Sequence, residues 1–157
     1  RRYNPITTTS QLAAIIQKVM PTKRAGQIDP VTRSFQALRI YINRELDELK
    51  EGLAAVEAML KPSGILAVVS FHSLEDRIVK RFLAERSQAA AKPSRHMPQV
   101  ASPPPTFELL SRKAVLPGAS EKSENARSRS AKLRIARRTS APSMGNDYHA
   151  NNPLREC

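Results

Sequence analysis

The chain has 157 residues and a formal net charge of +12, with 26 Lys and Arg residues against 14 Asp and Glu residues. Its length suits one domain, and no run of about 18 apolar residues is present, which excludes a membrane-spanning helix. The single cysteine, Cys157, excludes an internal disulfide and fits a cytoplasmic protein. The chain starts at Arg1 without Met or an apolar signal segment, so we expect further sequence upstream and no secretion signal.

The positive charge is concentrated in two segments. Residues 77–96 carry a net charge of +5, and residues 112–138 carry +7. Such self-repulsion favours a polyanionic partner, because phosphates that bind basic side chains release their counterions. For residues 112–138 we favour nucleic acid as the partner over a basic surface that is merely solvated.

The first predicted helix spans residues 8–20. Thr8 and Gln11 have the spacing of a capping box, and Leu12, Ile15 and later apolar residues form one stripe before Pro21.

A second, longer helix is predicted from Asp29 to Leu60. Asp29 is a good N-cap residue and Pro30 suits the first helical position. Apolar side chains recur every three or four residues from Phe35 onward, so one face of the helix must pack on another element. Gly52 is the position at which this helix could bend or break.

Residues 65–71 predict a strand that is apolar on both faces apart from Ser70. Strands of this kind are typical of parallel sheets that are covered on both sides. A helix is expected before the strand and another after it, from about Leu74 to Arg86. This pattern predicts an α/β fold with a doubly wound sheet.

The remaining residues predict a loop, two strands and a tail. Residues 87–106 are rich in Pro, Ala and Ser and are expected to form a loop. Strands are expected at 107–115 and 132–137. The second alternates apolar with basic residues, so one of its faces is predicted to be wet or to contact a ligand. Residues 139–157 lack periodicity and predict a disordered tail.

The stretch SFHSLED, residues 70–76, follows the predicted strand at the end where ligands bind in open α/β sheets. Ser73 and Asp76 also have capping-box spacing, and we favour that structural role for both, with Glu75 as a solvated helix residue. For His72, a place in a cleft and a simple hydrogen bond to a loop carbonyl are both open.

Several common kinds of active site are missing from the sequence. No G-x-S-x-G elbow, P-loop or G-x-G-x-x-G motif occurs, and the three histidines are scattered. With five glycines in the chain, no cradle for a cofactor phosphate is present. The chain by itself is therefore predicted to be incomplete as an enzyme.

Three stretches closely resemble the ribosomal RNA small subunit methyltransferase H family, also called MraW. They are RSFQALRIYINRELDELKEGL, LKPSGILAVVSFHSLEDRIVKRF and LLSRKAVLPGASEKSENARSRSAKLRIA. A fourth stretch, ITTTSQLAAIIQKVMP, resembles the end of the helical insert that these proteins carry. The resemblance runs from about Pro5 to Arg138 without a large gap.

The resemblance implies an enzyme that uses S-adenosyl-L-methionine to methylate N4 of a cytosine in the decoding region of 16S ribosomal RNA. It covers only the C-terminal half of the family, so the residues that bind the cofactor are expected upstream of this chain, which is expected to be inactive alone. The implied fold is the C-terminal half of a Rossmann-like class I methyltransferase sheet. Residues 65–71 would be its fifth strand, and the last two strands would form an antiparallel hairpin.

The resemblance also implies a division of the chain into parts. Residues 1–28 would end the inserted helical subdomain, and residues 29–138 would form the C-terminal part of the methyltransferase domain, with the loop 87–106 inside it. The disordered tail would follow at 139–157.

On this model the amine displaces the sulfonium methyl group directly, with no covalent enzyme intermediate and no metal. Ser70 and His72 would line the cytosine side of the cleft, into which the target base is unstacked. The partner would be 16S ribosomal RNA or the small ribosomal subunit in the cytoplasm, without a membrane. The residues expected to hold RNA phosphates are Arg77, Lys80, Arg81, Arg127, Arg129, Lys132 and Arg134.

The alternative function is that of a non-catalytic basic module that binds RNA or the ribosome. It explains the charge and the missing cofactor loop, but not a two-sided apolar strand that leads into a polar cleft. Binding of adenosylmethionine by the full-length protein would separate the two functions.

Overall fold

The computed structural model describes residues 5–20, 29–87 and 103–144. The chain divides into two compact units, Arg1–Glu45 and Leu46–Cys157. The predicted assignment of residues 1–28 to a helical insert concerns the first unit and stays a prediction. Most of the predicted loop 87–106 lies outside the described residues, as does the tail beyond residue 144.

The first unit contains two helices whose starts follow from their capping residues. Helix α1, Thr9–Val19, is preceded by Thr8, whose hydroxyl accepts the Gln11 N–H at 3.2 Å while the Gln11 side chain accepts the Thr8 N–H at 3.2 Å. Helix α2, Pro30–Asn43, begins after Asp29, whose carboxylate accepts the Val31 N–H at 2.7 Å. Both predicted caps are confirmed.

The prediction of a single long helix from Asp29 to Leu60 is wrong, because the helix is interrupted at Arg44. Arg44 adopts a left-handed conformation with φ of 52° and ψ of 30°, and helix α3, Glu45–Met59, starts directly after it. Glu45 holds the break by accepting hydrogen bonds from the side chains of Arg39 and Asn43. Gly52, the expected breaking point, lies inside α3 with open space around it.

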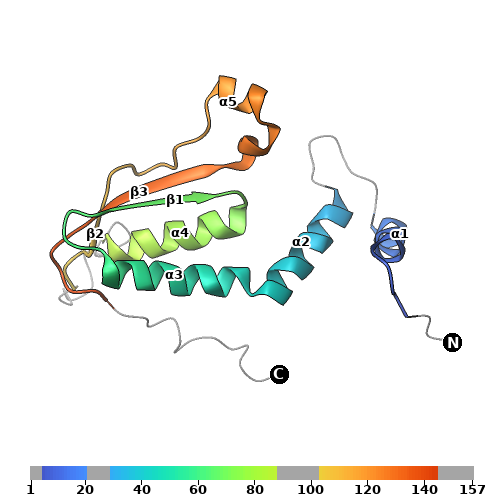
Figure 1. Ribbon diagram of the computed structural model, residues 1–157, viewed down its shortest axis with the longest axis horizontal. Coiled ribbons are helices and arrows are strands. Elements are labelled where there is room, and N and C mark those ends of the chain that lie inside the picture. The colour runs from blue at the N-terminus through green and yellow to red at the C-terminus, as the bar shows by residue number, and fades with distance from the viewer. Residues whose placement is uncertain (1–4, 21–28, 88–102, 145–157) are drawn as a thin grey trace, which may run out of the picture. The chain divides into compact units, whose positions relative to one another are not determined.

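The described strands form one antiparallel sheet in the order β1-β3-β2 (Figure 1). The strands are β1, Ile65–Ser70, β2, Phe107–Leu109, and β3, Lys132–Arg138. Because β3 is antiparallel to both neighbours, β1 and β2 run in the same direction. The strand predicted at 107–115 is shorter than expected. After Leu109, the Leu110 N–H still donates to the Ile135 carbonyl, and Val115 forms a single bridge to Leu133.

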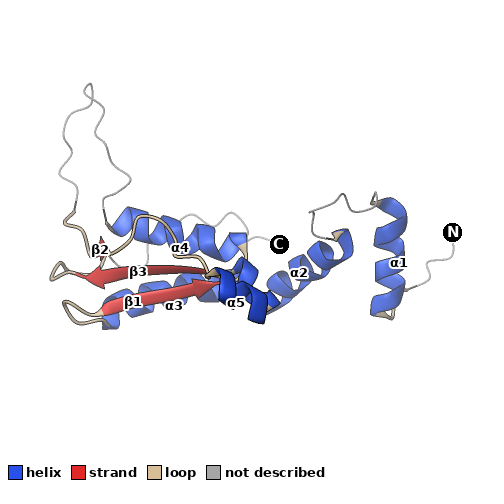
Figure 2. Ribbon diagram, turned by 90° about the horizontal axis from the view of Figure 1, so that it is seen from above, coloured by secondary structure: helices blue, strands red, loops and turns tan. Residues whose placement is uncertain are grey.

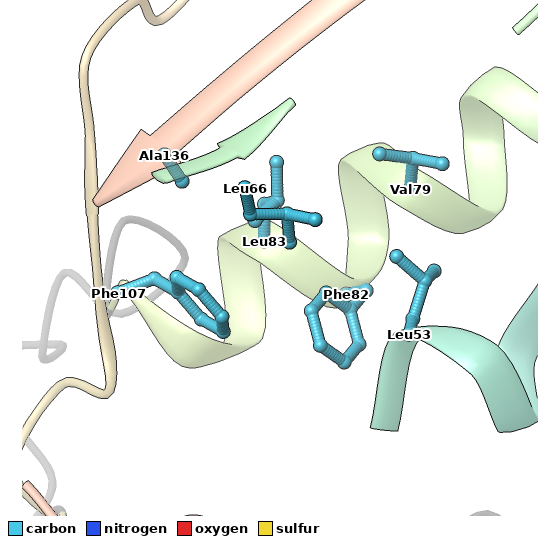
Figure 3. Packing of buried hydrophobic residues seen from close by; sticks show 7 residues of the cluster. All are labelled: Leu53, Leu66, Val79, Phe82, Leu83, Phe107 and Ala136. Atoms are coloured by element: carbon cyan, nitrogen blue, oxygen red, sulfur yellow. The ribbon is translucent and has the colours of Figure 1, made fainter. Parts of the chain in front are cut away.

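The core lies between one face of this sheet and two helices. Helices α3 and α4, Ser73–Arg86, cover the same side of the sheet (Figures 1 and 2). Figure 3 shows their side chains meeting those of the strands, with the rings of Phe82 and Phe107 5.9 Å apart. The buried apolar residues are Leu53, Leu66, Val79, Phe82, Leu83, Phe107 and Ala136.

The opposite face of β1 is apolar but is not covered by a helix of the described residues. Ile65 and Val69 are 50% and 54% exposed, whereas Leu66 on the other face is buried. The prediction that both faces of the strand are covered is therefore wrong for the described part of this chain. The reason is topological, since the helices before and after β1 pack on the same side.

A buried carboxylate joins four segments at the end of the sheet where β3 terminates. Glu57 on α3 is fully buried and accepts hydrogen bonds at 2.6 Å from Arg86 at the end of α4 and from Thr106 just before β2. Arg138 donates to the backbone carbonyls of Glu57 and Thr106, both at 3.0 Å. Buried charges are tolerated only when they are paired and hydrogen-bonded in this way.

The same network includes the first residues of the predicted tail. Thr139 donates its hydroxyl to the carbonyl of Pro105 at 2.7 Å, and the Met144 N–H lies 3.4 Å from Glu57 Oε1. Residues 139–144 thus begin the predicted tail with hydrogen bonds to the larger unit, and the prediction of a disordered tail stays a prediction.

We expect Glu57→Gln to lower the free energy of unfolding by about 3–5 kcal/mol, because Arg86 would remain buried without its counter-charge. Urea denaturation measures this loss. Replacing both partners, as Glu57→Leu with Arg86→Met, is expected to cost less than Glu57→Leu alone. A wild-type free energy of unfolding in Glu57→Gln would show that the network does not stabilise the fold.

Candidate functional site

The carboxyl end of β1 connects to α4 through Phe71 and His72, and a reciprocal capping box holds this link. The imidazole Nδ1 of His72 accepts the Glu75 N–H at 3.3 Å. The Glu75 carboxylate accepts the N–H groups of Phe71 and His72, at 2.9 and 3.2 Å. Three backbone donors at the helix start are thereby satisfied, and the strand end is held in one conformation.

The predicted cap lies one residue too far along the chain. Ser73 is the first residue of α4 and is exposed, whereas His72 has the extended backbone of an N-cap residue, with φ of −134° and ψ of 159°. Glu75, predicted to be a solvated helix residue, is the partner that closes the capping box. Asp76 reaches β3 instead of the helix start.

Both ring nitrogens of His72 lie against Glu75. Since Nδ1 accepts a hydrogen bond, the neutral ring carries its proton on Nε2. Nε2 lies 3.1 Å from Glu75 Oε1, yet it is buried and has no hydrogen-bond partner with suitable geometry among the described residues. The proximity of Nε2 to Glu75 Oε1 is therefore an electrostatic contact without a hydrogen bond. Nε2–H is thus the atom of His72 with unused hydrogen-bonding capacity.

Ser70, the other predicted catalytic residue, is buried at the last position of β1. Its hydroxyl lies 3.4 Å from the carbonyl of Lys132, the residue it faces across the β1–β3 pair. The structure thus places Ser70 and His72 at the same strand end, two residues apart, with Ser70 on the face that α4 covers.

Asp76 connects α4 to the start of β3 through two ion pairs. Its carboxylate accepts the Nε–H of Arg134 at 2.7 Å and the ammonium of Lys132 at 3.1 Å. The Arg134 side chain is 14% exposed and that of Lys132 38%. Burial raises the pKa of Asp76, but the hydrogen bonds and charges of Arg134 and Lys132 outweigh burial and leave this pKa below its usual value.

These contacts correct the prediction for the basic face of β3. Residues 132, 134, 136 and 138 share the face of β3 that packs against α3 and α4, and Ala136 and Arg138 are buried there. The face predicted to be wet is therefore partly covered, and Asp76 pairs with two of its cations, Lys132 and Arg134. The sequence contained a usable signal, because Ala136, a small apolar residue, shares the face of Lys132 and Arg134.

The other predicted RNA-binding residues are exposed. Arg77, Lys80 and Arg81 lie on the outer side of α4, where Arg81 pairs with Glu85 at 2.8 Å. Arg127 and Arg129 lie on the 3₁₀ helix η1, Ala126–Ser130, which follows the short helix α5, Ala119–Glu124, and leads into β3.

A buried serine, which the sequence analysis missed, fixes the conformation of η1. Ser128 donates its hydroxyl to the carbonyl of Asn125 at 2.8 Å, and the Asn125 side chain accepts the Arg127 N–H at 3.0 Å. Because Ser128 points inward, its neighbours Arg127 and Arg129 project into solvent from a rigid turn. This arrangement can present two guanidinium groups to a phosphate chain.

The described residues show neither a metal cluster nor a cradle for a cofactor. They contain no group of three His, Cys, Asp or Glu residues that could hold a metal ion. Of the described glycines, Gly52 and Gly118 have open space around them and Gly64 precedes a strand, so none forms a turn after a strand end. No helix of the described residues is long and apolar enough to cross a membrane.

A comparison with protein-family models matches residues 1–139 to the MraW methylase family. The chain belongs to the MraW methylase family. The match includes the whole β1–α4 link, η1 and β3, and hence all the residues of the candidate site.

Curated relatives of this MraW-family chain carry the name ribosomal RNA small subunit methyltransferase H. The Bradyrhizobium diazoefficiens protein is 54% identical over 153 residues, which cover 98% of this chain and 46% of the relative. A Rhodopseudomonas palustris protein is 58% identical over 142 residues, 90% of this chain and 42% of the relative. A Caulobacter protein is 54% identical over 143 residues, 90% of this chain and 44% of the relative. The chain thus spans less than half the length of these relatives.

We expect Asp76→Asn to lower the free energy of unfolding at pH 7 by about 1–3 kcal/mol, because two partly buried cations lose their counter-charge. The folded-state pKa of Asp76 is depressed, so its contribution is present above the unfolded pKa of about 3.9 and is lost as pH falls through the folded pKa. The difference in the free energy of unfolding between wild type and variant should therefore become smaller below about pH 4.

The matched control for this pH titration is Asp47→Asn, which removes a more exposed pair with Lys50, a residue on the same helix. We expect that change to cost less than about 1 kcal/mol. Urea denaturation at a series of pH values measures both variants. A difference for Asp76→Asn that stays constant from pH 7 to pH 3 would contradict the ion-pair account.

Proposed function

We propose that this chain is the substrate-side part of an enzyme that methylates N4 of a cytosine in the decoding region of 16S ribosomal RNA, with S-adenosyl-L-methionine as methyl donor. The observation that carries the proposal is the family match over residues 1–139, together with relatives named as small-subunit ribosomal RNA methyltransferases. Residues that bind the donor are expected in the part of the relatives' length that this chain does not span.

The sheet supports placing the chain at one edge of a class I methyltransferase fold. Strands β1 and β2 run in the same direction with the antiparallel β3 between them. The apolar outer face of β1 and its other edge suit further strands and helices from the remainder of the protein, because exposed sheet edges and apolar faces are normally covered. Residues 1–28 are proposed as the end of the helical insert.

In the proposed reaction the donor supplies a methyl group, the cytosine N4 lone pair attacks its carbon as the sulfur–carbon bond breaks, and N4 then loses a proton. This chain contributes position and charge. The capping box of His72 and Glu75 holds the strand end rigid, so that Ser70 and the His72 Nε2–H would keep a fixed place on the cytosine side of the cleft. The basic residues nearby would hold the RNA backbone while the base is unstacked.

The carboxylates at this strand end are poorly suited to accept the proton from N4. Asp76 is held ionised by two cations, which lowers its basicity. Glu75 already accepts two backbone N–H groups and lies against the His72 ring. The proton acceptor is therefore proposed to be neither of these two carboxylates.

We expect the intact protein, meaning this chain joined to the part that completes its relatives' length, to transfer labelled methyl from adenosylmethionine to one cytosine of 16S ribosomal RNA. The chain alone should neither transfer methyl nor bind adenosylmethionine. Equilibrium dialysis and mass spectrometry of digested RNA provide the two readouts. An intact protein that binds RNA but not adenosylmethionine would support the non-catalytic binding module instead.

Two substitutions at His72 separate a role toward cytosine from a role in capping. His72→Ala removes both the cap and the imidazole, whereas His72→Asn keeps a side chain that caps helices well. If the imidazole lines the cytosine side, both variants lower the methylation rate of the intact protein at least tenfold, while only the alanine variant loses about 1 kcal/mol of stability. Full recovery of the rate in His72→Asn would show that His72 serves only as a cap.

A further inference from the structure

The seven basic residues predicted to hold RNA phosphates fall into two groups in the structure. Arg77, Arg127 and Arg129 are exposed and make no ion pair within the described residues. Lys80 and Arg81 are exposed as well, and Arg81 pairs with Glu85 on the same helix. Arg134 and Lys132 instead point under α4 and bind Asp76. Pairing and lower exposure therefore separate Lys132 and Arg134 from Arg127 and Arg129, although the four residues are close in the sequence.

The contact with Asp76 leaves Arg134 little capacity for a phosphate. The Arg134 side chain is largely buried, and its Nε–H is committed to Asp76 Oδ1 at 2.7 Å. A phosphate that approached Arg134 or Lys132 would also meet the ionised Asp76 carboxylate, which repels it. Binding there would place the phosphate beside the Asp76 carboxylate, whereas binding at a guanidinium with no carboxylate beside it carries no such repulsion.

The exposed cations are supported on rigid backbone close to the same point. Ser128 and Asn125 fix the turn from which Arg127 and Arg129 project, and this turn ends two residues before Lys132. Arg77 follows Asp76 on α4, so it lies beside the place where α4 and β3 are joined. A phosphate chain could therefore pass from η1 to the start of α4 without contacting the two paired residues.

Given the proposed function, we propose that Asp76 is a positioning residue that keeps Lys132 and Arg134 out of the RNA contact. RNA phosphates then bind Arg127, Arg129 and Arg77. The strand end beside Asp76 stays free of backbone phosphate and is left to the neutral target base. In this scheme Asp76 acts on RNA binding through the two cations it holds.

The salt dependence of RNA binding tests this division. The intact protein is titrated with an RNA oligonucleotide that covers the decoding-region cytosine, at several salt concentrations. The logarithm of the RNA association constant falls as the logarithm of the salt concentration rises, and the steepness of this fall is called the slope here. On single-stranded nucleic acid, the slope decreases by about 0.7 for each phosphate that the protein no longer neutralises. Arg129→Gln should lower the slope by about that amount, whereas Arg134→Gln should leave it unchanged. Asp76→Asn should raise it by about 0.7 to 1.4, because one or two cations become available.

A paired variant guards against loss of the fold. Asp76→Asn with Arg134→Gln removes the more buried pair together, so only the more exposed Lys132 loses its counter-charge. Its slope should be between that of wild type and about 0.7 above it, because only Lys132 is released. All variants are compared below their melting temperatures.

Three outcomes separate the inference from the function on which it rests. A slope for Arg134→Gln that falls as far as that of Arg129→Gln would overturn the division of the cations while leaving RNA binding in place. An unchanged slope in Asp76→Asn would also overturn it. A folded intact protein whose RNA binding shows no salt dependence, or is unaffected by Arg129→Gln, would instead contradict the proposed RNA contact itself.

Discussion

The burial of Glu57 is the constraint on which the rest of the larger unit depends. A carboxylate with no access to water must be matched by donors, and those donors come from the end of α4, the residue before β2 and, through the carbonyl of Glu57, the end of β3. Meeting this requirement aligns both helices on one face of the sheet and fixes the start of β2 and the end of β3. The apolar core between them then has a defined thickness and contains the tilted pair of Phe82 and Phe107.

The two ends of β3 are held in the same manner but serve different purposes. At both ends a helix supplies an acceptor to a cation on the inward face of the strand: Asp76 to Arg134 at the start, and the carbonyl of Glu57 to Arg138 at the finish. The C-terminal end of β3, at Arg138, is buried and stabilises the fold. The starting end lies beside the carboxyl end of β1, where ligands bind in sheets of this kind, and it borders solvent. Arg138 therefore belongs to the fold, whereas the residues around Lys132 border the candidate site.

Much of this arrangement could be predicted from the sequence because it depends on local patterns. The caps at Thr8 and Asp29, the strand at 65–70 and the helix that follows it each require only a few neighbouring residues. The errors arose where distant residues decide. The break at Arg44, the partners of Asp76 and the burial of Glu57 depend on side chains that come together only in the folded chain. The cap of α4 was misplaced by one residue because Ser73 is the commoner capping residue and histidine a rarer one.

The pairing of the last strand with the first has a consequence for how the molecule reaches its native state. Ser70 pairs with Lys132, 62 positions later, and Arg138 bonds Glu57 across 81 positions. Loop closure over such distances precedes most of the gain from packing, so formation of the sheet is expected to be slow compared with the helices. Since β3 lies between β1 and β2, neither of these strands finds its described neighbour until residues 132–138 have left the ribosome. During synthesis the edge of β1 that pairs with β3 therefore stays unpaired until that strand emerges, and unpaired strand edges are prone to aggregation.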